Sequence, residues 1–241
     1  MSKIMSELIV LEAIEAGDLA WDDDVSISEY AYEISHQPGY SSVLLEKDRT
    51  YTVEQLFKAM VIHSANGATI ALAEKVAGSE REFVQLMNEK AIELSLDASS
   101  FVNSTGLTNV DLLGNHPLGS EDDMNKMSAS DLVRLSIYIL NEYPELLEIT
   151  KLTEFMLHDE TFLNSNWMLP ESDVEFVEED VTFHTVDGLK TGYTKAAGYS
   201  FTGTATINDV RIVSVVIGME EIEDRFSETK KFYQLLEAGN G

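Results

Sequence analysis

The sequence contains no cysteine, which excludes disulfide bonds, thiolate metal sites and a cysteine nucleophile. No uninterrupted apolar run is long enough to span a membrane. The opening residues MSKIMSELIV are broken by Ser6 and Glu7, so they do not read as a signal peptide. Basic residues are scarce: 16 Lys and Arg stand against 43 Asp and Glu, for a formal net charge of -27. Because this charge would repel phosphates over the whole surface, we predict no nucleic-acid partner.

The apolar content is sufficient for one sizeable core. Hydrophobic residues make up 44% of the 241 positions, and no internal repeat divides the chain. We therefore expect residues 1–241 to form a single domain.

Apolar periodicity and capping residues predict that helices dominate the first two thirds of the chain. Thr52, Ser79 and Ser128 carry the short polar side chains that favour helix N-caps. The expected helices are 2–15, 52–63, 67–76, 83–94, 144–149 and 226–236, with another running from Ser128 past Ile139. Between them we expect an irregular segment with two short strands at 18–49, a long ordered loop at 101–126 and a solvated acidic loop at 171–180.

Strand signals are confined to the last third. Runs rich in β-branched and aromatic residues cover 181–189, 199–207 and 210–218, and Asn208-Asp209 provides a turn between the last two. These runs predict an antiparallel meander. The expected fold class is therefore α+β, with helices packed on an antiparallel sheet.

Two short motifs bring together polar groups that could serve a binding site. Ser64-Ala65-Asn66 lies between two predicted helices, so its hydroxyl and amide could face a cleft, although such a tripeptide also serves as a simple helix cap. Lys190-Thr191-Gly192 lies at the end of a predicted strand. A cation, a hydroxyl and a residue without a side chain could together hold a substrate carboxylate, although an ordinary exposed strand end has the same appearance.

Lys3 lies in the first turn of a helix whose later turns are apolar. A buried lysine near other cations loses its proton readily and can act as a general base, whereas a lysine this close to a terminus is otherwise a solvated end.

Histidines and aromatic residues give weaker signals. His63 adjoins Ser64, but a histidine at a helix end is more often structural, and the sequence has no His-Glu-x-x-His pattern. We therefore predict no metal site. Tyr193 and Trp167 could line a cleft or pack in the core or at its rim.

Together, Lys3, Ser64-Ala65-Asn66 and Lys190-Thr191-Gly192 resemble, in order and spacing, the Ser-x-x-Lys, Ser-x-Asn and Lys-Thr-Gly motifs of the serine penicillin-binding proteins. The chain is most similar to the low-molecular-weight D-alanyl-D-alanine carboxypeptidases of Gram-positive bacteria. The blocks that carry this resemblance are MSKIMSELIVLEAIEAG, SANGATIALAEKVAGSE, FVNSTGL, MSASDLVRL, DGLKTGYTKAAGYSFTGTA and RFSETKK.

The resemblance implies a β-lactamase/transpeptidase-like fold and a role for each motif. Lys3 would take the proton of a serine nucleophile, Ser64 would relay protons to the leaving group and Asn66 would hold the substrate amide. Lys190, Thr191 and Gly192 would bind the terminal carboxylate, and the backbone N–H of Tyr193 would form one arm of an oxyanion hole. The implied reaction is removal of the terminal D-alanine from a peptidoglycan stem peptide through an acyl-enzyme, with no cofactor and no metal.

The sequence departs from the family at the nucleophile. The serine of Ser-x-x-Lys would be the residue just before Met1, and Ser2 cannot replace it because one position on a helix turns a side chain by roughly 100°. We therefore expect an N-terminally truncated and inactive chain that also lacks the family's N-terminal strands, its C-terminal β-rich domain and its membrane anchor. The edge of strand 210–218 would then be unpaired, which favours a dimer.

Two alternatives remain. A non-catalytic peptidoglycan-binding remnant would keep the groups that hold a carboxylate and lose the nucleophile. A class A β-lactamase would share the motif order, but the acidic run around Glu171 has no evident counterpart to its water-activating glutamate. The resemblance further implies β-lactam binding by the full-length protein and an extracytoplasmic location on the cell-wall side of the membrane.

Overall fold

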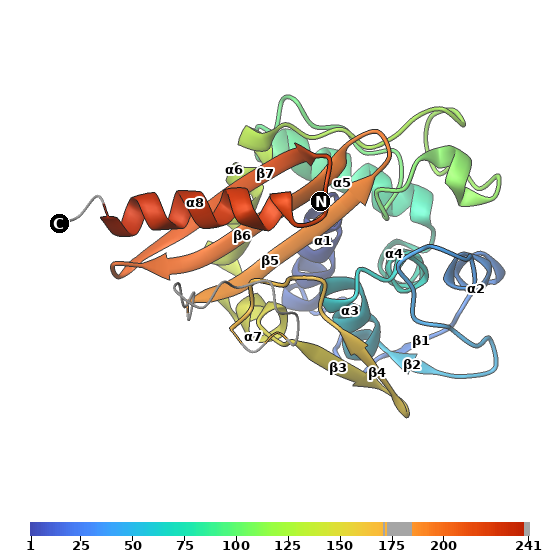
Figure 1. Ribbon diagram of the computed structural model, residues 1–241. Coiled ribbons are helices and arrows are strands. Elements are labelled where there is room, and N and C mark those ends of the chain that lie inside the picture. Colours follow the sequence, from blue (N-terminus) through green and yellow to red (C-terminus); the bar gives the residue numbers. More distant parts are fainter. Residues whose placement is uncertain (171, 173–184, 239–241) are drawn as a thin grey trace.

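The computed structural model describes residues 1–170, 172 and 185–238. Its main sheet has three antiparallel strands in the order β5-β6-β7, formed by Val186–Thr194, Gly198–Ile207 and Val210–Met219. Figure 1 shows α8 (Asp224–Ala238) crossing one face of this sheet, with the other helices on the opposite side. The α+β class and the antiparallel meander are therefore confirmed.

The helical body follows the predicted pattern closely. Its elements are α1 (Lys3–Glu15), α3 (Val53–Ile62), α4 (Asn66–Ala77), α5 (Glu80–Glu93), α6 (Ala129–Glu142) and α7 (Leu147–Thr150). Thr52 forms a capping box with Gln55, and the hydroxyls of Ser79 and Ser128 accept from the backbone N–H three residues on. The residues predicted to start these helices therefore do so.

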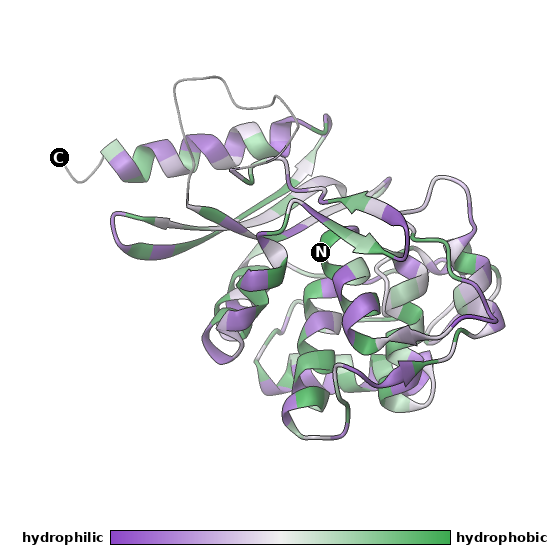
Figure 2. Ribbon diagram, turned by 90° about the horizontal axis from the view of Figure 1, so that it is seen from below, coloured by the Kyte–Doolittle hydropathy of each residue, from purple (hydrophilic) through white to green (hydrophobic). Residues whose placement is uncertain are grey.

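Two apolar layers enclose the sheet. On one side Phe226 and Tyr233 of α8 pack with Phe201 and Ala205 of β6. The helices form the larger cluster on the other side, where Val213 and Val215 of β7 contact it. Figure 2 shows the sheet lying between α8 and the helical body. Ile212 of β7 packs against the cluster on the α8 side instead, so successive residues of this strand face opposite layers.

Three predictions about secondary structure were wrong in detail. Segment 18–49 contains a helix, α2 (Glu29–Ser35), and one short strand, β1 (Asp24–Val25), which pairs with β2 (Tyr51–Thr52). A hairpin of β3 (Glu154–Leu157) and β4 (Glu160–Leu163) precedes the expected strands. Strand β5 extends to Thr194, so the Lys-Thr-Gly motif lies inside the strand and not at its end.

The 101–126 segment is mostly loop, as predicted, with one 3₁₀ turn, η1 (Asn109–Leu112). A second 3₁₀ turn, η2 (Pro144–Leu146), follows α6 and leads into α7. Asn208 and Asp209 form the β6–β7 turn and both have positive φ, which Asn and Asp tolerate best among residues other than glycine. The prediction of an acidic loop at 171–180 lies outside the described residues, apart from residue 172. The start of the strand predicted at 181–189 also lies outside them.

Strand β7 pairs only with β6 in the part of the chain that the structure describes. The predicted unpaired edge at 210–218 is therefore present there. No helix among the described residues is both long and apolar enough to cross a membrane.

Candidate active site

Lys3 lies at the start of α1 and is almost completely buried, with 5% of its surface exposed. Its Nζ donates hydrogen bonds to Asn66 Oδ1 at 2.7 Å and to the Thr105 carbonyl at 2.8 Å. Burial and, next, the positive charge of Lys190 lower the pKa of Lys3 to about 7. Lys3 can therefore be neutral near physiological pH, which is the property a general base requires.

The Ser64-Ala65-Asn66 motif connects α3 to α4, and unusual backbone geometry fixes it there. Ser64 has a φ of 59°, in the left-handed region. The Ala65 N–H bonds to the Ala59 carbonyl and the Asn66 N–H to the Ser41 carbonyl. Asn66 thus starts α4 with its side chain on Lys3, while the half-buried Ser64 hydroxyl makes no hydrogen bond to any described residue.

The Lys190-Thr191-Gly192 motif lies in β5 at the sheet face toward α1. Lys190 is 2% exposed, and its Nζ has no hydrogen bond or ion pair with a described residue. A Cβ built on Gly192 would lie 2.7 Å from the backbone nitrogen of Met1, so only glycine allows the residue that precedes α1 to lie against this strand. Burial lowers the pKa of Lys190 to about 8, and the charge of Arg225 acts in the same direction.

The hydroxyl of Thr191, the second residue of this motif, contacts the hydroxyl of Ser165. Ser165, in the turn after β4, lies 2.5 Å from Thr191, oxygen to oxygen. Tyr193 is 58% exposed and stacks on Tyr199 with 4.3 Å between ring centroids, so it forms part of the rim. Trp167 packs against Phe226 at 5.5 Å, next to the cluster beneath α8.

The loop that supplies the Thr105 carbonyl is held by buried hydrogen bonds. Asn103 Oδ1 accepts from the N–H and hydroxyl of Thr105 and from the Gly106 N–H. The next residue, Ser104, donates both its N–H and its hydroxyl to Glu80 Oε1 and accepts from Ser6 of α1. These bonds join the loop to α1 and α5 and fix one of the two acceptors of Lys3.

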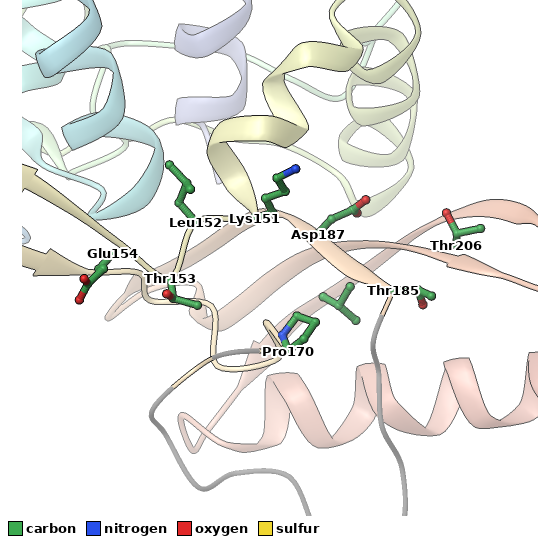
Figure 3. Close-up of a pocket in the computed structure, with 9 residues that line it drawn as sticks. Lys151, Leu152, Thr153, Glu154, Pro170, Thr185, Asp187 and Thr206 are labelled. Atoms are coloured by element: carbon green, nitrogen blue, oxygen red, sulfur yellow. The ribbon is translucent and has the colours of Figure 1, made fainter.

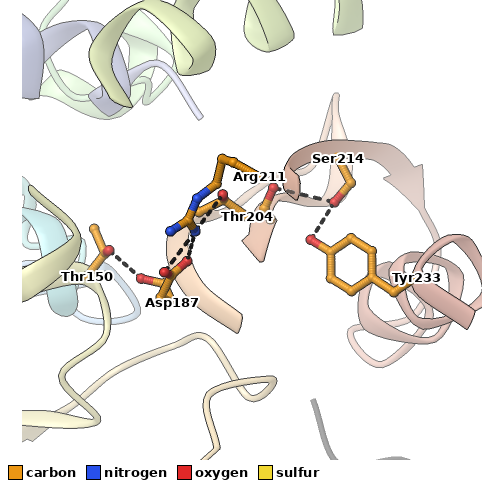
Figure 4. A network of polar contacts seen from close by, with 7 residues as sticks. Thr150, Asp187, Thr204, Arg211, Ser214 and Tyr233 are labelled. Atoms are coloured by element: carbon orange, nitrogen blue, oxygen red, sulfur yellow. Dashed lines mark hydrogen bonds and ion pairs between the residues drawn. The ribbon is translucent and has the colours of Figure 1, made fainter. Parts of the chain in front are cut away.

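A polar network anchors β5 within the sheet (Figure 4). The Arg211 guanidinium forms an ion pair with Asp187 at 2.6 Å, and the Thr150 hydroxyl donates to the Asp187 carbonyl. Ser214 and Tyr233 hydrogen-bond at 3.0 Å and connect β7 to α8. The strand that carries Lys190 is therefore held from β7 and from α7.

Three side chains in or near the site were not predicted: Glu7, Ser165 and Arg225. Glu7 is 1% exposed and Arg225 is 4% exposed, and both act electrostatically on Lys190. The sequence signal for Glu7 was present but unused, since it lies four residues after Lys3 in the mostly apolar segment 4–11.

The remaining candidates lie outside this cluster. His63 Nδ1 hydrogen-bonds with the Leu163 carbonyl at 3.0 Å and the ring packs on Phe162, which favours a structural role. Over the described ranges, no group of three or more His, Asp or Glu side chains is arranged to hold a metal. A cavity of about 610 Å³ lies between the 151–154 segment and the start of β5 (Figure 3); Lys3, Asn66 and Lys190 are not among its lining residues.

Comparisons with known proteins point to one family. The sequence pattern of the D-alanyl-D-alanine carboxypeptidase family, peptidase S11, matches residues 1–221. The chain is 33% identical over 237 residues to D-alanyl-D-alanine carboxypeptidase DacF of Bacillus subtilis, covering 96% of this chain and 53% of that one. It thus spans about half the length of the curated relatives it matches.

Solved structures show the same fold. The peptidoglycan synthesis regulatory factor PBP3 of Streptococcus pneumoniae superposes with a TM-score of 0.89 at 35% identity, covering 98% of this chain and 65% of that one. Penicillin-binding protein D2 of Listeria monocytogenes, solved in its cefotaxime-bound form, superposes with a TM-score of 0.78 at 28% identity, covering 98% and 85%.

Proposed function

Because the chain belongs to the D-alanyl-D-alanine carboxypeptidase family of serine hydrolases, we propose that its site binds peptidoglycan stem peptides ending in D-alanyl-D-alanine. The proposed reaction of the whole protein is serine-type removal of the terminal D-alanine. We also propose that residues 1–241 act as one transpeptidase-like catalytic domain, since α1, α4 and β5 all contribute to the same cluster.

One observation carries the proposal. Two buried lysines with different surroundings lie near the same site: Lys3 is bound by two neutral acceptors, whereas Lys190 has no partner among the described residues. Lys3 is suited to accept a proton. Lys190, with a pKa of about 8, is still mostly protonated at neutral pH and is suited to bind a carboxylate.

The other motif residues would assist either Lys3 as the base or Lys190 as the carboxylate-binding group. Thr191 would donate its hydroxyl to the same carboxylate, and Gly192 would let the substrate backbone approach. Asn66 would hold the substrate amide, and Ser64 would return the proton of Lys3 to the leaving amine. The Tyr193 N–H would stabilise the tetrahedral oxyanion. Neither a cofactor nor a metal has a role in this scheme.

The nucleophile of this scheme is a serine three residues before Lys3, and the 241 residues do not contain that position. Binding of the substrate by residues 1–241 can therefore be measured apart from the acylation step.

Relatives support β-lactams as ligands of the complete protein. Penicillin-binding protein D2 of Listeria monocytogenes was solved in cefotaxime-bound and ampicillin-bound forms. Since peptidoglycan is assembled outside the cytoplasmic membrane, we place the site of action there.

Isothermal titration calorimetry tests the proposed ligand. N-acetyl-D-alanyl-D-alanine should bind the chain, and the same peptide with a C-terminal amide should bind at least tenfold more weakly, because about 1.5–3 kcal/mol resides in hydrogen bonds to a charged group. Lys190→Met should remove the difference between acid and amide. Equal binding of the acid and the amide by the unaltered chain would contradict the proposal.

A further inference from the structure

Asn164 is the first residue after β4, and its hydrogen bonds fasten the end of the β3–β4 hairpin to the segment that precedes the hairpin. Its Nδ2 donates to the carbonyls of Leu152 at 2.8 Å and Thr150 at 3.1 Å. Its backbone N–H donates to the Thr153 carbonyl at 2.7 Å, and its Oδ1 accepts from the Asn166 N–H at 2.9 Å. All four partners are backbone groups, so these bonds fix the course of the chain at this point.

The two residues beside Asn164 contact opposite parts of the site. On one side, the Leu163 carbonyl hydrogen-bonds with Nδ1 of His63, the residue that precedes the Ser-Ala-Asn motif. A carbonyl oxygen can only accept, so the ring carries a proton on Nδ1. On the other side, the hydroxyl of Ser165 lies 2.5 Å from that of Thr191. Three consecutive residues therefore reach from the end of α3 to β5.

A second connection between Asn164 and β5 passes through α7. Thr150, whose carbonyl accepts from Asn164, donates its own hydroxyl to the Asp187 carbonyl of β5 at 2.5 Å. The hairpin also packs on α3, which ends at the Ser-Ala-Asn motif (Figure 1). The hairpin end is thus linked to β5 near the start of the strand and again at Thr191.

We propose that Asn164 is a positioning residue that closes the hairpin end, holds the Ser165 hydroxyl on Thr191 and so sets the place of the Thr191 hydroxyl that binds the substrate carboxylate. Both amide hydrogens of Asn164 are taken by backbone carbonyls. Asn164 therefore acts through Ser165. This inference rests on the proposed function of Lys190 and Thr191 as the carboxylate-binding groups.

The hydroxyl pair explains why this position matters for binding. Each hydroxyl has one hydrogen to donate and can also accept. When Ser165 donates to Thr191, the hydrogen of Thr191 is left for the substrate carboxylate. Hydrogen bonds in such a chain also strengthen one another. A displaced Ser165 would leave the Thr191 hydroxyl without a fixed direction.

The chain offers a matched control for Asn164→Ala. On α5, Asn88 Nδ2 donates to the carbonyls of Val84 and Phe101 at 2.8 Å each, and its Oδ1 accepts from the Phe101 N–H at 2.9 Å. Asn164→Ala and Asn88→Ala therefore remove the same set of side-chain bonds from two different places. Both should lower the stability of the protein, but only Asn164→Ala should change the carboxylate site.

The first measurement examines the hairpin contact without ligand, by NMR of ¹⁵N-labelled histidine rings at pH 8. The His63 signals are assigned by their loss in His63→Gln. In the unaltered chain and in Asn88→Ala, His63 should carry its proton on Nδ1, because that nitrogen donates to the Leu163 carbonyl. In Asn164→Ala this preference should be lost. An unchanged His63 spectrum in a folded Asn164→Ala protein would overturn the inference.

The second measurement is calorimetric binding of N-acetyl-D-alanyl-D-alanine and of its C-terminal amide, at a temperature where every variant is folded. The preference of the unaltered chain for the acid should fall about fivefold in Asn164→Ala and stay unchanged in Asn88→Ala. Ser165→Ala should show the same loss, and Ser165→Thr, which keeps the hydroxyl, should not. The double variant of Asn164→Ala and Ser165→Ala should lose no more than either single one, because both act on Thr191.

Two results would separate this inference from the proposed function. If Asn164→Ala keeps the full preference for the acid, or Asn88→Ala loses as much of it, the inference is wrong and the proposed function stands. If the unaltered chain binds acid and amide equally, the proposed function is wrong and the inference falls with it.

Discussion

Because α4 packs closely against α2, we predict that a glycine-to-alanine substitution in α4 lowers the stability of the protein, whereas such substitutions in helices usually raise it. Gly67 is the second residue of α4, directly after Asn66. Replacing glycine with alanine in a helix normally stabilises a protein, by up to about 1 kcal/mol. Here a Cβ on residue 67 would lie 2.7 Å from both the Ala31 carbonyl oxygen and Ser35 Cβ of α2.

The structure therefore predicts that Gly67→Ala destabilises the protein. Neither contact is the far end of a flexible side chain, so α2 would have to move away from α4. Inserting one methyl group into such a well-packed contact costs about 1–3 kcal/mol, which exceeds the gain in helix propensity. Because α4 begins with Asn66, the displacement should also disturb the Lys3–Asn66 hydrogen bond.

Urea unfolding followed by circular dichroism measures this free energy. Ala77→Gly, at the other end of α4, measures the difference in helix propensity between alanine and glycine in the same helix. It should lower the free energy of unfolding by no more than about 1 kcal/mol. A Gly67→Ala protein as stable as the unaltered chain, or more stable, would refute the argument from close packing.

Other predictions follow from buried polar groups and charge. Glu80→Ala should lower the free energy of unfolding by about 1–3 kcal/mol in urea titrations, because the Ser104 N–H and hydroxyl lose their buried acceptor. Tyr233→Phe should cost about 1 kcal/mol by the same assay, since the ring is kept and the hydroxyl that hydrogen-bonds with Ser214 is lost. The folded pKa of Lys3 is about 7, below its ordinary value of 10.5, so the unfolded chain binds more protons between these limits and stability due to Lys3 rises with pH there. Lys3→Met should remove that rise in a comparison of urea midpoints at pH 7 and pH 10. With a net charge of -27, the thermal midpoint should rise between 0.01 M and about 0.15 M NaCl as self-repulsion is screened.

Local signals in the sequence were enough to predict most of the helices. The Thr52 capping box and the Ser79 and Ser128 caps each specify where a helix begins, independently of its tertiary contacts. Helix α2 was missed because it is short and only Ala31, Ile34 and Ser35 of it are buried, which is too few for a visible apolar period.

Strand prediction depended on context that the sequence does not display. Phe155 and Leu157 of β3 alternate with exposed residues, but this strand has only four residues and begins with an acid, so the alternation is too short to recognise. In β5, Leu189, Lys190 and Thr191 are all buried because helices cover one side and α8 the other. Polar residues buried in succession look like a strand end, which is why the motif was placed at the end of the strand and not within it.

The motif residues Lys3 and Asn66 were predicted, and the structure places them in hydrogen-bonding contact. The second acceptor of Lys3 is a backbone carbonyl at Thr105, and a carbonyl has no sequence signature. The burial of Glu7 and Arg225 depends on contacts that folding brings together, so one helix or strand considered alone could not indicate it.

The most direct test of the central claim is intact mass after incubation with benzylpenicillin. A variant with one serine placed immediately before Met1 completes the Ser-x-x-Lys motif, and a variant with alanine there is its matched control. We predict that the serine variant gains the mass of one penicillin, while the alanine variant and the unaltered chain gain none. Labelling of the unaltered chain, or no labelling of a folded serine variant that still binds N-acetyl-D-alanyl-D-alanine, would contradict the assignment of Lys3, Ser64, Asn66 and Lys190 to a serine carboxypeptidase site.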